Sequence, residues 1–155
     1  MFEYKHTVEA DVSRRSLWRL YSDVSTWPIW DQGIEWISLY GDFIKGSSGN
    51  IKPTGQDELP YRLTEVVPDH GFTDETAIPW AGVTIRFVHS LEAIEGGKTR
   101  LTHHVSIFGP GAESLGPEIG PGITSGIPET MNSIANLARS MDELIFHYRN
   151  SGKQA

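Results

Sequence analysis

The sequence predicts an α+β domain built from one strand, a helical segment, about six further antiparallel strands and a long C-terminal helix. Apolar residues alternate singly at the start and in the middle of the chain, and they recur at helical spacing near its end. Residues typical of turns separate the short β-like segments. We expect a single domain over residues 1–149 and a frayed tail over residues 150–155.

The N-terminal segment predicts a strand followed by a helix. Alternation places one dry face and one charged face on the strand, the dry face carrying Phe2, Tyr4, His6, Val8 and Ala10. Ser13 suits the N-cap of a helix over residues 13–23, because its hydroxyl can accept a hydrogen bond from a free N–H of the first turn.

The segment Trp27-Pro28-Ile29-Trp30-Asp31 marks the end of this helix. Pro28 lacks an N–H group and moves Trp27 out of the α region, so we expect a turn here. Two exposed indoles would be costly, because each aromatic side chain can bury on the order of 150–250 Å². We expect Trp27 to be structural, Trp30 to be either structural or part of a ligand site, and Asp31 to form the turn.

The middle of the chain predicts short strands that end in a strong hairpin. The segments are 34–40, 49–53, 61–67, 72–78, 83–94 and 99–108. Matching apolar faces across the loop Glu95-Gly96-Gly97 predicts cross-strand pairs at 91–101, 89–103, 87–105 and 85–107. The same register sets Glu92 opposite Arg100 on the outer face.

The C-terminal third combines a glycine- and proline-rich stretch with a helix. The glycines between residues 109 and 126 predict a mobile flap, or a close approach of a helix to the sheet. Pro128 suits the first turn of a helix that we expect to end near Tyr148. Its apolar stripe is Met131, Ile134, Ala138, Met141, Ile145 and Tyr148.

Composition narrows the function classes. The chain has no cysteine, so it forms neither a disulfide framework nor a thiolate zinc site. Its net charge of −7 argues against nucleic-acid binding, which needs clustered cations. No apolar run approaches the ~20 residues of a membrane span, and residues 1–6 do not resemble a secretion signal. We therefore expect a cytoplasmic domain without a cofactor, because no phosphate-binding glycine loop or metal-ligand helix motif occurs.

Residues 23–31, Asp-Val-Ser-Thr-Trp-Pro-Ile-Trp-Asp, resemble the Asp-Val-x-x-Trp-Pro-x-Trp-Asp element of the polyketide cyclase/dehydrase and lipid-transport family. This family is part of the START-like (SRPBCC, helix-grip) superfamily. Residues 97–103 and Gly109-Pro110 are similar to its final hairpin, and the likeness covers roughly residues 2–141. The resemblance implies a curved antiparallel sheet of about seven strands, wrapped around the last helix and enclosing an apolar cavity.

Family members bind lipids, polyketides, hormones or other hydrophobic molecules, and a minority are aromatase/cyclases or dehydratases. The resemblance therefore implies binding or transport of a hydrophobic small molecule, with such an enzyme as the alternative. An apolar wall with a few polar points fits a small-molecule site, although the same residues could simply fill a core. The expected ligand-binding residues are Trp30, Tyr4, His6, Ile85, Phe87, His89, His103, Val105, Met131 and Ile134.

Three histidines, His6, His89 and His103, fall on inward faces and are open to three interpretations. They could be a hydrogen-bonded core group, polar anchors for a ligand with acid–base work, or a metal site that we disfavour because no carboxylate is clearly adjacent. The catalytic candidates are His89, His103 and Arg62, although the strand faces around Arg62 do not separate and favour a surface position. The sequence leaves oligomeric state, ligand identity and catalysis open.

Overall fold

The computed structural model describes residues 1–154, and the side-chain surroundings of residues 1–151. The strands of its antiparallel sheet, in the order β1-β7-β6-β5-β4-β3-β2, are β1 Phe2–Ala10, β2 Ile34–Tyr40, β3 Ser48–Pro53, β4 Leu59–Val67, β5 Gly71–Ile78, β6 Val83–Ala93 and β7 Thr99–Phe108. The helices are α1 Arg14–Tyr21, α2 Trp27–Trp30, α3 Ala112–Thr124 and α4 Ile127–Gln154.

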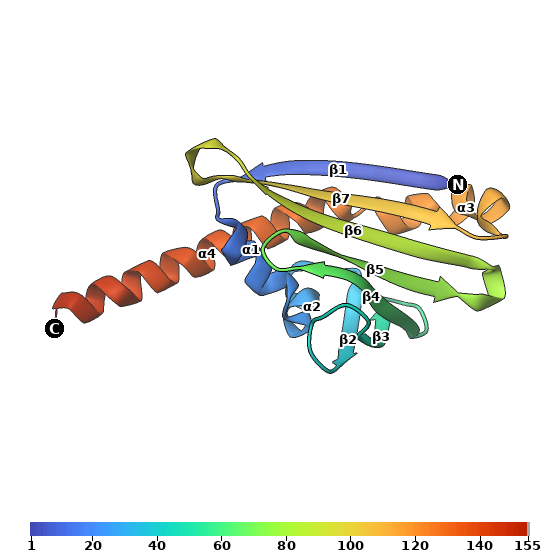
Figure 1. Ribbon diagram of the computed structural model, residues 1–155, viewed down its shortest axis with the longest axis horizontal. Coiled ribbons are helices and arrows are strands. Elements are labelled where there is room, and N and C mark those ends of the chain that lie inside the picture. Colours follow the sequence, from blue (N-terminus) through green and yellow to red (C-terminus); the bar gives the residue numbers. More distant parts are fainter. Residues whose placement is uncertain (155) are drawn as a thin grey trace.

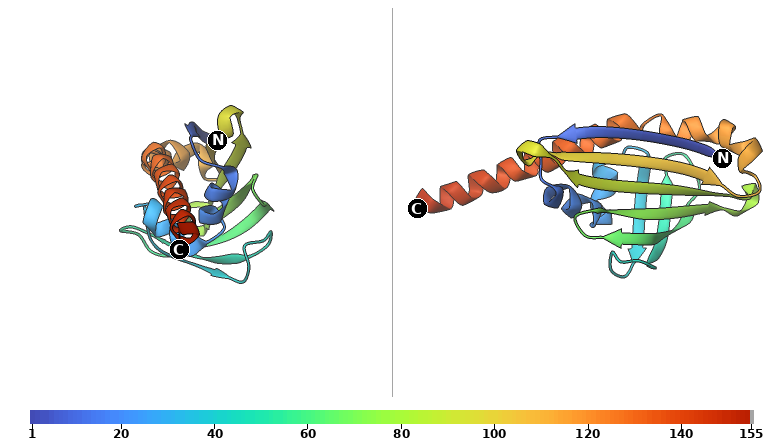
Figure 2. Two further views of the ribbon diagram at one scale, coloured as in Figure 1. Left: turned by 90° about the vertical axis from the view of Figure 1, so that its left-hand side faces the viewer. Right: turned by 45° about the horizontal axis from the view of Figure 1, so that its top comes forward.

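The sheet curls around one side of α4, as the end-on view shows (Figure 2). Helices α1 and α2 follow β1 and cover the concave face beside α4 (Figure 1). The register shifts between Ile34 and Trp36 on β2 and between Leu63 and Glu65 on β4, and such irregularities strengthen the local bend of a strand. The predicted α+β class, the seven strands and the helix-grip arrangement are confirmed.

The predicted hairpin of β6 and β7 is confirmed in its register. His89 pairs with His103, Phe87 with Val105, and Glu92 with Arg100. Arg100 forms ion pairs with Glu92 on β6 and with Glu9 on β1, at 3.2 and 3.0 Å. Gly96 and Gly97 at the hairpin tip both have positive φ, which explains why this loop needs glycine. The alternation of the two strands therefore determined which side chains face inward.

Helix α1 begins as predicted, with the Ser13 hydroxyl accepting a hydrogen bond from the Ser16 N–H. Residues 27–30 form a single helical turn, α2, and Trp27 itself is in the α region with φ −57° and ψ −43°. The prediction that Pro28 moves Trp27 out of this region is therefore wrong, because Pro28 lies in the first turn of α2, where a missing N–H costs no helical hydrogen bond. Both indoles are buried, and each donates a hydrogen bond: Trp27 to the Tyr21 carbonyl at 2.9 Å and Trp30 to the Thr26 hydroxyl at 3.1 Å. Asp31 is a turn former as expected, because its carboxylate accepts from the Gly33 N–H.

The glycine- and proline-rich stretch is a helix, α3, so the prediction of a mobile flap is wrong. The alternative prediction, a close approach of helix to sheet, is confirmed. A Cβ on Gly116 would lie 3.1 Å from the Cβ of Phe2, and one on Gly120 would lie 2.6 Å from its ring. Packing against β1 therefore outweighs the poor helix propensity of Pro117 and Pro121, each of which removes a helical hydrogen bond.

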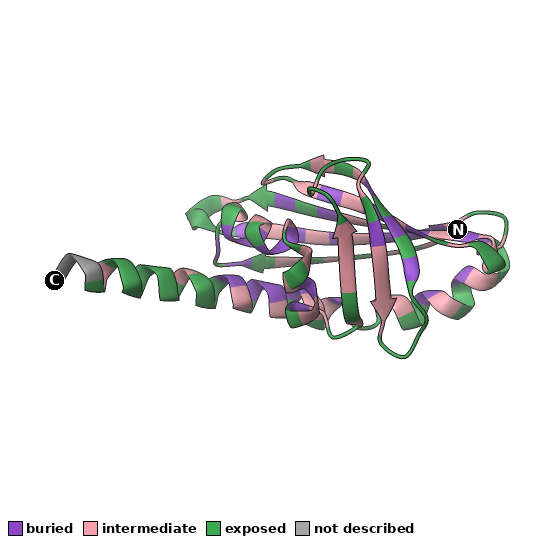
Figure 3. Ribbon diagram, turned by 90° about the horizontal axis from the view of Figure 1, so that it is seen from below, coloured by how far each residue is buried: buried purple, intermediate pink, exposed green. Residues whose placement is uncertain are grey.

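Helix α4 is longer than predicted and outruns the sheet (Figures 1 and 3). Met131, Ile134 and Ala138 of its apolar stripe are buried against the body of the molecule. The stripe then continues into solvent, where Tyr148 is 81% exposed, because no strand lies opposite this part of the helix. The helix extends to Gln154 rather than ending near Tyr148, and the division into a domain ending at residue 149 and a frayed tail stays a prediction.

Candidate functional site

The inward histidines lie in one transverse row across the sheet. Antiparallel pairing of β1 with β7 sets His6 opposite His103, and β7 pairs with β6 to set His103 opposite His89. The row continues to Phe72 on β5. His89 and His103 are buried, whereas His6 on the edge strand is half-buried. The predicted clustering of the three histidines on neighbouring strands is therefore confirmed.

Tyr21 of α1 packs against the histidines of this row. Its hydroxyl oxygen lies 2.7 Å from Nε2 of His103, a short hydrogen bond within the core. The His89 ring stacks on Phe72 with their centroids 4.0 Å apart, and it meets the His103 ring edge to face at 4.5 Å. An aromatic cage of Tyr21, Phe72 and Trp27 thus surrounds two neutral imidazoles.

A carboxyl group that the sequence did not identify completes the cluster. Asp74 on β5 is buried on the inner face, and its Oδ2 lies 3.9 Å from Nδ1 of His89. The expectation that no carboxylate is adjacent to the histidines is therefore wrong. The alternation of Phe72, Asp74 and Thr76 along β5 was the signal that could have found it, because Glu75 points outward to an ion pair with Arg86.

Burial determines the charge state of the cluster. Desolvation raises the pKa of Asp74 to about 8, with the charge of Glu75 adding to the rise. Desolvation, together with the smaller effect of the nearby His6, lowers the pKa of His103 to about 3. Desolvation and the proximity of His103 also lower the pKa of His89 well below 6.5, and an interaction with the backbone of Phe72 opposes only part of this fall. At neutral pH the cluster is therefore a set of uncharged hydrogen-bonding groups.

One atom of the cluster lacks a partner. Nδ1 of His89 is buried and has no hydrogen-bond partner among the described residues. Its distance to Asp74 exceeds the ~3.2 Å limit of a hydrogen bond. A buried polar atom left unpaired costs about 1–3 kcal/mol, so such atoms are rare and often mark a functional position. Nδ1 of His89 is therefore still available to form a hydrogen bond.

The predicted ligand-binding residues divide into two groups by burial. Val105, Met131 and Ile134 have no exposed surface, and Ile85 and Trp30 are nearly as buried, so a role in ligand contact stays a prediction for them. Tyr4, His6 and Phe87 are half-buried. Arg62 is exposed on the opposite face of the sheet, paired with Glu75, so the structure does not bring it near the histidines.

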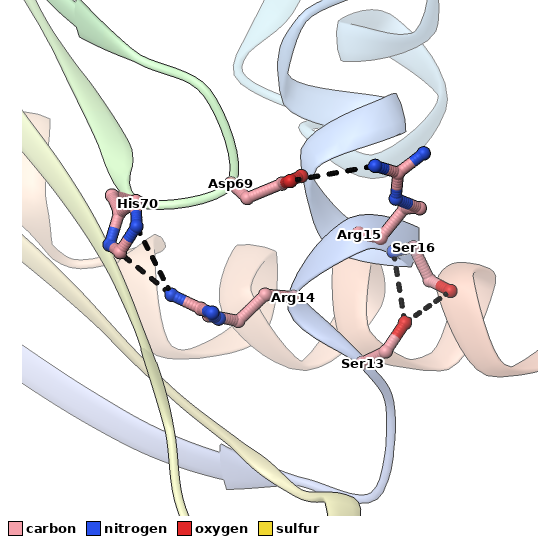
Figure 4. Close-up of polar contacts among 6 residues, drawn as sticks. All are labelled: Ser13, Arg14, Arg15, Ser16, Asp69 and His70. Carbon is pink, nitrogen blue, oxygen red and sulfur yellow. Dashed lines mark hydrogen bonds and ion pairs between the residues drawn. The ribbon is translucent and has the colours of Figure 1, made fainter.

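Two hollows of the described chain lie outside the space between sheet and α4, so the predicted apolar cavity is not among them. One, about 420 Å³, opens on the β4–β5–β6 surface near Val88 and Thr73. The other, about 350 Å³, lies between the start of α1 and the β6–β7 tip. At its rim Arg14 donates a hydrogen bond to His70 at 3.2 Å, and Arg15 lies 3.9 Å from Asp69, so both cations tie α1 to the β4–β5 turn (Figure 4).

Neither a metal site nor a membrane span is found in the described chain. Among these residues no group of three or more His, Asp or Glu side chains is placed to hold a metal ion. No described helix is long and apolar enough to cross a membrane.

The Tyr21–His103 hydrogen bond gives a testable contribution to stability. We expect Tyr21→Phe to lower the free energy of unfolding by about 1–3 kcal/mol, because Nε2 of His103 would remain buried without its partner. Urea unfolding followed by tryptophan fluorescence measures this loss. Tyr148→Phe, in the exposed end of α4, is the matched control and should change stability by less than about 0.5 kcal/mol. Equal effects of the two substitutions would contradict the role assigned to this bond.

The fold matches several solved structures across nearly its whole length. Ara h 8.0201 matches with a TM-score of 0.72 at 12% identity, covering 90% of this chain and 98% of that chain. Norcoclaurine synthase from Thalictrum flavum matches with a TM-score of 0.68 at 15% identity, covering 88% and 85%. Protein NE0264 from Nitrosomonas europaea matches with a TM-score of 0.69 at 17% identity, covering 91% and 96%.

At this level of identity the comparisons establish the fold alone. The chain has the helix-grip fold. No family model and no curated protein sequence matches it.

Proposed function

We propose that this helix-grip chain binds a hydrophobic small molecule, such as a lipid or polyketide-like compound, on the concave face of its sheet. The observation that carries the proposal is the environment of Phe87. Its cross-strand neighbours Val105 and Asp74 are only 0% and 6% exposed, yet Phe87 itself is half-buried. A large ring that stays partly uncovered between buried neighbours indicates unfilled space at its tip.

Other inner-face residues support the same interpretation. Apolar side chains on β2 and β3 are half-buried although they pack against the core: Ile37, Leu39 and Ile51. Together with Phe87 and Tyr4 they supply an apolar surface, while the Asp74–His89–His103 cluster supplies a few polar points. Small-molecule sites combine these two kinds of surface.

A protein with the same fold supports the proposal by analogy. Norcoclaurine synthase from Thalictrum flavum has a structure in complex with dopamine and hydroxybenzaldehyde, and that structure matches this chain with a TM-score of 0.68. The helix-grip fold can therefore hold small aromatic molecules, although fold alone does not transfer a function.

Titration with 2-ethylnaphthalene, an apolar probe, tests binding through the change in tryptophan fluorescence, to which the buried Trp27 and Trp30 contribute. We expect saturable binding, and we expect Phe87→Ala to weaken it about fivefold to tenfold, because one aromatic contact contributes about 1 kcal/mol. Val88→Ala, one residue away on the outer face, is the control and should bind as the wild type does. Failure to saturate, or equal affinities of the two variants, would contradict the proposed site.

The alternative function, a cyclase or dehydratase, gains one specific observation. A pKa near 8 makes Asp74 a better acid–base group at neutral pH than His103, whose pKa of about 3 leaves it unprotonated. This alternative would therefore use Asp74 as its proton donor rather than the two histidines. The mass and the NMR spectrum of a carbonyl compound recovered after incubation with the protein distinguish the two functions. Binding alone leaves both unchanged, a dehydration lowers the mass by one water, and an intramolecular cyclisation keeps the mass but changes the NMR spectrum.

A further inference from the structure

We propose that Asp74, supported by His89, is the polar anchor of this site and takes the carbonyl or hydroxyl oxygen of an uncharged ligand while excluding carboxylates. The inference rests on the proposed function, binding on the concave face, and specifies the ligand class.

The first step of the argument is position. Asp74 lies directly opposite Phe87 in the register, so its carboxyl group borders the partly uncovered ring. Its side chain keeps 8% of its surface exposed and that of His89 keeps 10%, but Nδ1 of His89 itself is sealed from solvent. A ligand lying over Phe87 therefore has the Asp74 carboxyl group beside it, whereas Nδ1 of His89 is not accessible to it.

The second step is hydrogen-bonding capacity. Asp74 and His89 are 3.9 Å apart, and a contraction of about 1 Å would allow a hydrogen bond between them. Protonated on Nδ1, His89 can then donate to one carboxyl oxygen while the acid proton of Asp74 is donated to the ligand oxygen. This arrangement gives Nδ1 of His89 a partner and removes the cost of leaving it unsatisfied.

The third step is charge. The titratable groups near Asp74 are His89 on β6, Tyr61 on β4 and its chain neighbour Glu75, and none of them supplies a positive charge at neutral pH. Arg62 and Arg86 pair with Glu75 in the register on the outer face of the sheet. A ligand carboxylate beside Asp74 would therefore be desolvated without a counter-ion, which is strongly unfavourable.

Three probes that share one ring system test the anchor on the full chain at pH 6.5. 2-Acetylnaphthalene carries a carbonyl, 2-ethylnaphthalene carries no oxygen, and 2-naphthoate carries a carboxylate. We expect the ketone to bind about tenfold more tightly than the ethyl compound, as one added hydrogen bond allows, and the carboxylate to bind at least tenfold more weakly than the ketone.

Substitutions at Asp74 test whether its carboxyl group causes the preference for the ketone over the ethyl compound. Asp74→Leu should reduce the tenfold preference for the ketone to parity, whereas Asp74→Asn, which keeps a neutral donor and acceptor, should retain it. Glu75→Leu, on the outer face, is the matched control and should also retain it. In the wild type the preference should disappear above pH 9, where Asp74 ionises and loses its proton, while in Asp74→Asn it should persist.

The possible outcomes test the role of Asp74 separately from binding on the concave face. Equal affinities for the ketone and the ethyl compound in the wild type, or a preference that survives Asp74→Leu, would overturn the anchor while binding on the concave face stands. A failure of all three probes to bind would overturn both proposals.

Discussion

Replacing Ile134 with alanine is expected to lower the free energy of unfolding by about 2–5 kcal/mol. Ile134 lies on the face of α4 that the sheet encloses, and it is 0% exposed. Removing its three outer carbons costs their transfer free energy and leaves a cavity that a close-packed interior closes only in part. Urea unfolding, followed by circular dichroism, measures this change.

Ile145→Ala provides a control on the same helix with the same chemistry. Ile145 is 36% exposed and lies where α4 has outrun the sheet, so we expect a loss below about 1 kcal/mol. The ratio of the two losses reports whether α4 is held by the sheet at Ile134. Similar losses at both positions would contradict the enclosure of α4 that defines this fold.

A second large effect is expected in the pH dependence of stability. The folded-state pKa of Asp74, about 8, is higher than the value of 3.8 expected for it in an unfolded chain. Between these values the unfolded state loses a proton that the folded state keeps, so Asp74 makes stability fall as pH rises from 3.8 to about 8. From pH 6.5 to 8, above the pKa values of the histidines, we expect the free energy of unfolding to fall by roughly 2 kcal/mol.

The histidines act in the opposite direction at lower pH. Their folded-state pKa values lie below the usual 6.5, at about 3 for His103, so acidification protonates them in the unfolded state first. Stability from both residues is therefore lost as pH falls below 6.5, and this loss exceeds the gain from the single group Asp74. We expect a maximum of stability near pH 6.5.

Asp74→Asn isolates the alkaline side of this profile. The amide has the same shape but does not ionise, so stability should no longer fall between pH 6.5 and 8, and at pH 7.5 the variant should be more stable than the wild type by up to about 4 kcal/mol. Thermal and urea unfolding across pH 4–9 measure the two profiles. An alkaline side that stays unchanged in the variant would rule out Asp74 as its cause.

Local sequence patterns predicted the seven strands, helices α1 and α4, and the direction in which most strand residues point. Alternation in β1, β6 and β7 placed His6, His89 and His103 on one face, because the side-chain period of a strand is two and apolar faces must match across a hairpin. Ser13 located the start of α1 for an equally local reason, since its hydroxyl caps the first turn.

Contacts between distant parts of the chain depend on how the whole molecule packs. Helix α3 can approach β1 closely at Gly120 because this residue has no side chain. The Phe2 ring, more than a hundred residues away in the sequence, lies where a Cβ would be. The polar cluster likewise joins Tyr21, Asp74 and His103 from three separate elements. Distances between such residues depend on sheet curvature and helix placement, which are set by packing of the whole core rather than by any short segment.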